Sequence, residues 1–70
     1  MRKSLLRKDM AKYLYMVYDD KQCFYVVSVG EIKITKNGDI TTKNVLYTSK
    51  YIIDCLDYFD KGVKNESKIL

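Results

Sequence analysis

Hydrophobic and polar positions along the chain predict three β-strands followed by one amphipathic helix. Residues 13–18 are aromatic or aliphatic throughout, which is typical of a strand, and polar residues 19–22 supply a turn. A longer apolar run follows at residues 23–35, with Gly30 inside it, and the third predicted strand covers residues 39–47. Because the connections are short, the pattern indicates an antiparallel β-meander.

Gly30 divides the second predicted strand at a change of side-chain parity. On one face of the strand before the glycine, apolar residues occupy odd positions, whereas Ile32 and Ile34 after it occupy even positions. The odd-numbered residues are Cys23, Tyr25, Val27 and Val29. One extra residue at Gly30 would return both groups to a single face, as a β-bulge does. The sequence therefore predicts one continuous strand with a bulge at this glycine.

The turn at residues 36–39 permits two strand registers. A two-residue loop sets Ile34 opposite Thr41. A three-residue loop, with Gly38 in the left-handed region, sets Ile34 opposite Ile40 instead. The second register keeps both isoleucines on one face, so we predict it.

Residues 50–61 predict a helix that ends at Gly62, with Thr48 or Ser49 as its N-cap. Apolar residues share one side of this helix, within an arc of about 100°. They are Ile52, Cys55, Leu56, Phe59 and Val63, and the opposite side carries Asp54, Asp57 and Asp60. Residues 64–70 are expected to form a frayed polar tail.

The N-terminal segment, residues 1–12, holds the entire formal charge of +4. Its basic residues are Arg2, Lys3, Arg7, Lys8 and Lys12, against the single acid Asp9, whereas the remainder has eight lysines and eight acids. Two predictions stay open for this segment. It forms a short helix, with apolar residues at helical spacing, or it is a loosely ordered arm.

Together these elements predict an α+β fold. It is a three-stranded antiparallel β-meander with one amphipathic C-terminal helix packed on it and a short basic N-terminal helix or arm. Seventy residues suffice for a single small domain, residues 1–70, made of the basic segment 1–12, the sheet and helix at 13–63, and the tail at 64–70.

Both faces of the predicted sheet are apolar, although one helix covers only one face. One face holds Leu14, Met16, Cys23, Tyr25, Val27, Val29, Ile32, Ile34, Ile40 and Leu46, and the other holds Tyr13, Tyr15, Val17, Phe24, Val26, Val45 and Tyr47. Three covers for the second face stay open: the N-terminal helix, a second copy of the chain, or a different protein.

Catalysis and metal binding have little support in the sequence. The chain has no histidine, and Cys23 and Cys55 are too far apart for a paired metal or redox motif. We therefore expect no enzyme activity, no cofactor and no metal. No apolar run approaches the length of a membrane span, so we expect no membrane partner and a cytoplasmic location with reduced thiols.

The preferred hypothesis is a non-catalytic protein-binding module. The tyrosine-rich sheet face (Tyr13, Tyr15, Val17, Phe24, Val26, Tyr47) or the acidic helix face (Asp54, Asp57, Asp60) would contact the partner. The alternative is a nucleic-acid-binding accessory protein that uses Arg2, Lys3, Arg7, Lys8 and Lys12. A second alternative is a self-assembling structural protein, including a homodimer.

The predicted order of helix, three strands and helix resembles that of some small phage-encoded inhibitors, including certain anti-CRISPR proteins. No residue motif accompanies this resemblance in topology. It implies a phage or mobile-element inhibitor or modulator of a host protein, located in the host cytoplasm.

Overall fold

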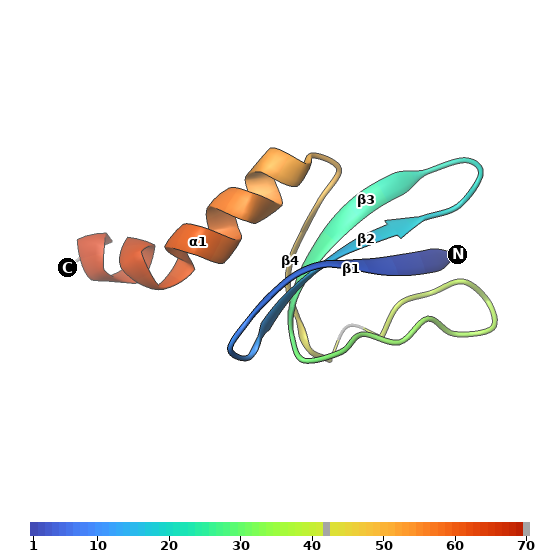
Figure 1. Ribbon diagram of the computed structural model, residues 1–70, viewed down its shortest axis with the longest axis horizontal. Helices are drawn as coiled ribbons and strands as arrows, with labels where there is room; N and C mark the ends of the chain where they lie inside the picture. The colour runs from blue at the N-terminus through green and yellow to red at the C-terminus, as the bar shows by residue number, and fades with distance from the viewer. Residues whose placement is uncertain (42, 70) are drawn as a thin grey trace.

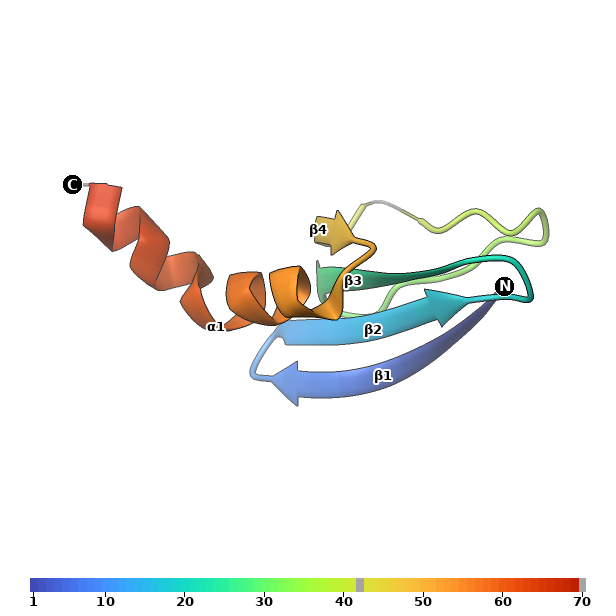
Figure 2. The same cartoon turned by 90° about the horizontal axis from the view of Figure 1, so that it is seen from above.

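The computed structural model describes the backbone of residues 1–41 and 43–69, and the side chains of residues 1–41 and 43–60. The chain forms a four-stranded antiparallel sheet with one helix against it (Figure 1). The elements are β1 (Arg2–Asp9), β2 (Lys12–Tyr18), β3 (Cys23–Val29), β4 (Val45–Ser49) and α1 (Ile52–Ile69). The strands lie in chain order, so β1 and β4 are the two edges of the sheet (Figure 2). The predicted α+β class is confirmed, but the sheet has one strand more than predicted.

The additional strand is β1, where the sequence predicted a helix or a loose arm. It pairs antiparallel with β2, and the ladder is interrupted by a bulge at Leu6. A two-residue turn at Met10 and Ala11 joins the two strands, with Met10 at φ 54°. Both predictions for this segment were wrong because pairing with β2, rather than an apolar pattern of its own, fixes its conformation.

β3 ends at Val29, and the predicted continuous bulged strand was wrong. Gly30 adopts φ 90°, in the region that glycine alone enters readily, and the chain leaves the sheet there. The buried hydroxyl of Ser28 donates a hydrogen bond of 2.7 Å to the Gly30 carbonyl. We call residues 30–44, which connect β3 to β4, the cover loop.

The tip of the cover loop has the predicted hairpin register. Ile34 and Ile40 form an isolated antiparallel bridge, and Gly38 lies at φ 86°. Thr35 N donates to the Asp39 carbonyl at 2.7 Å, which closes the three-residue loop. The predicted third strand over residues 39–47 was placed too early, because regular pairing with β3 covers only β4.

The cover loop shields the sheet face opposite α1 (Figure 1). Its buried Ile32 packs into one core cluster with Tyr15, Val17 and Val26, and Ile34 and Ile40 pack against the edge of that cluster. The second apolar face is therefore covered within the molecule, by a segment that was not among the three predicted covers.

The other core cluster lies between the sheet and α1. It contains Leu14, Val27, Cys55 and Phe59, all buried. Tyr47 also lies on this side: it pairs with Val27 and stacks on Tyr58, with ring centroids 4.8 Å apart. Its predicted position on the opposite face was wrong, because the register shifts between Val27 and Ser28.

α1 begins close to its predicted start but continues beyond Gly62. Ser49 Oγ accepts a hydrogen bond of 3.1 Å from Tyr51 N and donates one of 3.0 Å to the Asp54 carboxylate, which supports Ser49 rather than Thr48 as the cap. The helical backbone runs to Ile69, so the predicted end and the frayed tail were wrong for these residues. Residue 70 lies outside the described residues.

Candidate functional site

The structure does not assemble the predicted tyrosine-rich surface. Tyr15, Val17 and Val26 are buried beneath the cover loop, and Tyr13 and Phe24 are half-buried beside them. Burial raises the pKa of Tyr15, and the charge of Glu31 adds to this effect. Tyr47 lies on the helix side of the sheet, so these six residues share no exposed face.

The three predicted aspartates are exposed on α1, and they make contacts within the molecule. Asp60 forms an ion pair with Arg7. Asp54 accepts a hydrogen bond from Ser49. Asp57 also lies on the exposed side of the helix. A basic partner would therefore have to compete with existing contacts for at least two of the three carboxylates.

The basic residues of the N-terminal segment lie on the sheet. On the cover-loop side, the Lys3 ammonium lies 5.6 Å from the centroid of the Tyr15 ring and donates to the Ile32 carbonyl. Lys8 lies 5.3 Å from the centroid of the Tyr13 ring. These are cation–π distances, so both side chains lean from β1 across β2.

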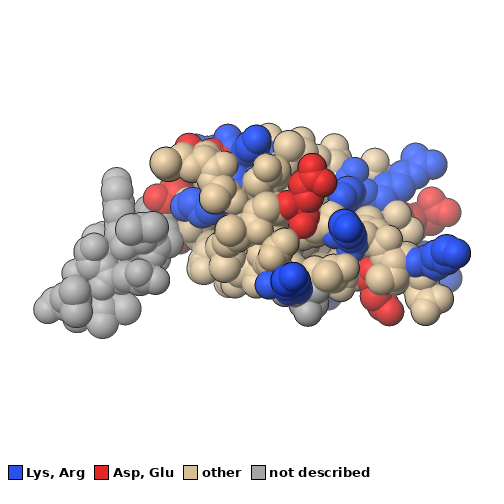
Figure 3. Space-filling view, turned by 90° about the horizontal axis from the view of Figure 1, so that it is seen from below, with Lys and Arg blue, Asp and Glu red and all other residues tan. Residues whose placement is uncertain are grey.

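On the helix side, Arg7 and Lys12 share one aromatic ring. The Arg7 guanidinium is 4.9 Å from the Phe59 centroid, and the Lys12 ammonium is 5.1 Å from it. Lys12 also donates to the Phe59 carbonyl, and Arg7 Nη2 is 3.0 Å from Asp60 Oδ1. On the face that Figure 3 shows, Lys and Arg side chains are interspersed with Asp and Glu rather than gathered in one block.

These contacts leave the outer edge of β1 open. The strand is paired with β2 on one side, and among the described residues no strand pairs with its other side. Leu5 and Leu6, in the middle of the edge, are 48% and 43% exposed. Lys3, Arg7 and Lys8 point inward across the sheet instead of shielding the edge. Unpaired N–H and C=O groups along such an edge can accept another strand.

The opposite edge, β4, offers less for a partner strand. β4 has five residues, compared with eight in β1. Leu46 on β4 is 44% exposed, close to the exposure of Leu6 on β1. Leu46 therefore provides a matched control for Leu6 in tests of the β1 edge.

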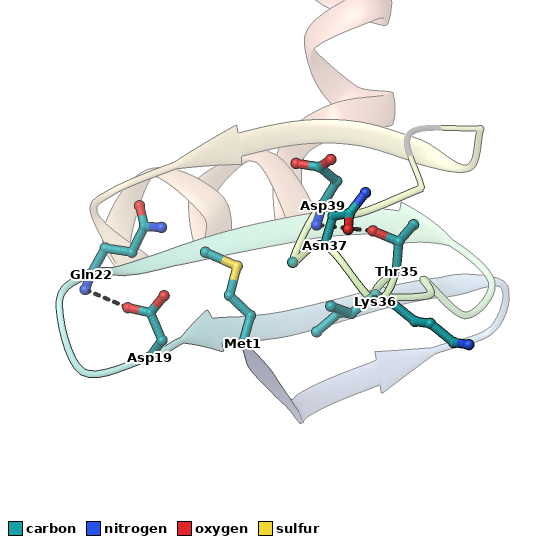
Figure 4. A pocket seen from close by; sticks show the side chains of 9 residues that line it. Met1, Asp19, Gln22, Thr35, Lys36, Asn37 and Asp39 are labelled. Carbon is teal, nitrogen blue, oxygen red and sulfur yellow. Dashed lines mark hydrogen bonds between the residues drawn. The ribbon is translucent and has the colours of Figure 1, made fainter.

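A polar hollow lies between the turn after β2, the N-terminal residue and the tip of the cover loop (Figure 4). The Asp19 carboxylate accepts hydrogen bonds from Lys21 N and Gln22 N at 2.8 and 2.9 Å, which lower the pKa of Asp19. At the other wall, Thr35 Oγ1 accepts from Asp39 N at 3.1 Å. The Asp19 carboxylate and the Thr35 hydroxyl thus stabilise the turns that form the hollow, and the described residues leave no buried side-chain polar atom unpaired.

The two cysteines lie in different environments, and Cys55 is buried in the core between sheet and helix. Burial, reinforced by the charge of Asp54, raises the pKa of the Cys55 thiol, which disfavours the reactive thiolate. Cys23 is exposed, and neither cysteine is in a disulfide. Within the described ranges, no three acidic, cysteine or histidine side chains are grouped closely enough to hold a metal ion. None of the described helix is both long enough and apolar enough to cross a membrane.

Comparisons with protein-family models, with curated proteins and with solved structures find no match to this chain. The β1 edge is the surface that sequence reasoning missed. Its signal is the arrangement of basic pairs at residues 2–3 and 7–8 around two leucines, because lysine and arginine are common on edge strands.

Proposed function

We propose that the protein is a non-catalytic protein-binding module that adds an extended segment of another protein to the free edge of β1. The observation that carries this proposal is the orientation of the β1 side chains. Lys3 and Lys8 lean over tyrosine rings of β2, and Arg7 leans toward α1, so the outer backbone of an eight-residue edge strand is accessible.

Strand addition uses the groups that this edge provides. Backbone hydrogen bonds to the edge supply affinity, and side chains that alternate between the two faces supply specificity. Leu5 and Leu6 add apolar contact area at the centre of the strand, where both are about half exposed. No buried polar group or catalytic residue is required for this function.

The edge is poorly suited to pairing with a second copy of itself. Antiparallel pairing of two β1 strands would bring basic side chains of the two copies close together, which destabilises the pair. The bulge at Leu6 also bends the strand, and natural edge strands use such bulges to avoid self-pairing. These features favour a different protein as the partner over the self-assembly alternative.

The nucleic-acid alternative uses the basic residues of the N-terminal segment, most of which lie on β1, where Lys3, Arg7 and Lys8 contact aromatic rings of the same chain. We therefore prefer the protein-binding proposal. The predicted order of helix, three strands and helix is also not the observed one, so the resemblance to small phage inhibitors does not extend to this topology. Inhibition of a host protein remains a narrower form of the proposal, in which the captured segment belongs to that host protein.

Site-specific photocrosslinking tests the proposed edge. A benzophenone amino acid replaces Leu6 on β1, Leu46 on β4 or Ile53 on the outer side of α1, in cells that naturally produce the protein. We expect a partner crosslink from position 6 only. The purified partner should then slow hydrogen exchange of the β1 amides. Crosslinks solely from position 46 or 53, or a partner that leaves β1 exchange unchanged, would contradict the proposal.

A further inference from the structure

We infer that the segment captured by β1 is acidic at both ends and apolar at its centre. This inference rests on the proposed function and specifies the chemistry of its partner. β1 carries Arg2 and Lys3 near one end, Leu5 and Leu6 in the middle, and Arg7 and Lys8 near the other end. A strand added along this edge, in either direction, places its own ends beside the basic pairs and its centre beside the leucines.

Most basic residues of β1 have intramolecular contacts, but few of these contacts are with an acidic group. The Lys3 ammonium contacts a tyrosine ring and a carbonyl oxygen, and the Lys8 ammonium contacts a tyrosine ring. None of these contacts supplies a negative charge. Among the side chains that the structure describes, Arg7 is the one basic residue of β1 with a carboxylate partner, Asp60, and about half of each of these two side chains is exposed. β1 therefore keeps a positive electrostatic potential that can attract an acidic partner.

The cations also lie on both faces of the sheet. Lys3 and Lys8 pair with Val17 and Tyr13, whose side chains are on the cover-loop side. Arg7 pairs with Leu14, on the helix side. Successive residues of an added strand alternate between these two faces. Two neighbouring acidic residues at one end of the partner can thus each approach a cation, one on each face.

The positively charged ends of β1 also explain why the edge can stay unpaired in the free protein. Like charges at the ends oppose a second copy, whereas opposite charges attract an acidic segment and raise its association rate. Leucine contacts at the centre then contribute to the lifetime of the complex. The charge pattern of β1 therefore favours an acidic segment by attraction and disfavours a second copy by repulsion.

Synthetic peptides test this pattern on the intact protein by two-dimensional NMR. The probe is acetyl-Glu-Glu-Thr-Val-Val-Glu-Glu-amide. One control, acetyl-Val-Glu-Glu-Thr-Glu-Glu-Val-amide, has the same composition with the acids moved inward. A second control replaces every Glu of the probe with Gln. We expect the probe to shift β1 amide signals with an affinity about fivefold or more above both controls at low salt, and this advantage should shrink as salt is added.

The outcomes separate the inference from the proposed function. Equal β1 shifts with the probe and the Gln peptide would overturn the acidic preference and leave strand addition intact. Equal binding of the probe and the rearranged peptide would overturn the end-and-centre pattern. No β1 shift with any peptide, or shifts confined to β4 and α1, would overturn strand addition itself.

A pair of double variants provides a second check. Arg2→Gln with Lys8→Gln removes two charges from β1, whereas Lys36→Gln with Lys43→Gln removes two from exposed positions of the cover loop. We expect the first variant to bind the probe about tenfold more weakly at low salt and the second to change affinity less than about twofold. Equal losses in the two variants would mean that only overall charge matters and would overturn the inference.

Discussion

The Arg7 guanidinium on β1 and the Asp60 carboxylate on α1 form an ion pair across the intervening strand β2, with Nη2 and Oδ1 3.0 Å apart. The same guanidinium lies over the ring of Phe59, which belongs to the core between sheet and helix. Arg7 thus ties the edge strand to the helix and points away from the open edge.

We predict a small, salt-sensitive coupling between Arg7 and Asp60. Both side chains are about half exposed, so solvent weakens the attraction. A double-mutant cycle with Arg7→Gln and Asp60→Asn should give a coupling of about 0.5 kcal/mol at low salt, measured by urea unfolding. The coupling should decline toward zero in about 1 M salt. A coupling that persists undiminished at high salt would contradict a solvent-screened pair.

The cover loop should contribute strongly to stability through Ile32. This side chain is 1% exposed and packs in the cluster with Tyr15, Val17 and Val26. Ile32→Ala should lower the free energy of unfolding by roughly 2–5 kcal/mol, because it leaves a cavity under the sheet. It should also increase binding of a dye that detects apolar surface.

Ile53→Ala is the matched control for Ile32→Ala, since Ile53 is 70% exposed on α1. Its effect on the free energy of unfolding should stay within about 0.5 kcal/mol. If the two substitutions had the same small effect, the cover loop would not be packed on the sheet in solution.

Met10→Gly should stabilise the protein. Met10 is 91% exposed and has φ 54°, so its side chain contributes little packing while its backbone lies in the left-handed region. Glycine enters that region without the steric cost, and we expect the free energy of unfolding to rise by up to about 1 kcal/mol. Thermal unfolding followed by circular dichroism measures the change.

Ala11→Gly tests the specificity of this effect, because Ala11 is the other residue of the turn and has no positive φ. That substitution should lower the free energy of unfolding by up to about 1 kcal/mol. If both glycines stabilised the protein equally, relief at Met10 would not be the cause.

Ionisation of Tyr15 should lower the free energy of unfolding in strong alkali. Burial raises its pKa above the ordinary value of 10.0, so above that pH the folded state holds a proton that the unfolded state has lost. The stabilising contribution is therefore complete below about pH 10 and is lost as the pH rises through the folded-state pKa.

Urea unfolding between pH 8 and 11 measures this effect. Tyr15→Phe should flatten the alkaline decline, whereas Tyr51→Phe, at an exposed tyrosine, should leave it unchanged. An unaltered decline in Tyr15→Phe would assign the alkaline loss to other groups.

Sequence reasoning located β2, β3, the start of α1 and the register at Ile34 and Ile40, because each has a strong local signal. It missed the β1–β2 hairpin because the turn at Met10 and Ala11 lacks the glycine or asparagine that normally marks such turns. As an exposed edge, β1 also needs no apolar face of its own.

The cover loop was misread for a different reason. Ile32 and Ile34 alternate as residues of a strand would, and Ile32 does face the core. Periodicity shows that a side chain is buried but not whether its backbone continues the sheet or folds beneath it. The open edge was not predicted because only the pairing order shows which strand is outermost, and the basic pairs at residues 2–3 and 7–8 were interpreted as part of a helix or an arm.

β1 begins toward one end of the longest molecular axis, and α1 ends toward the other (Figure 1). β1 begins at the second residue, so an affinity tag or fluorescent protein fused ahead of Met1 would sit beside the strand edge and obstruct it. A fusion placed after α1 would stand well away from that edge. Capture and imaging studies of this protein should therefore attach their label at the carboxyl end.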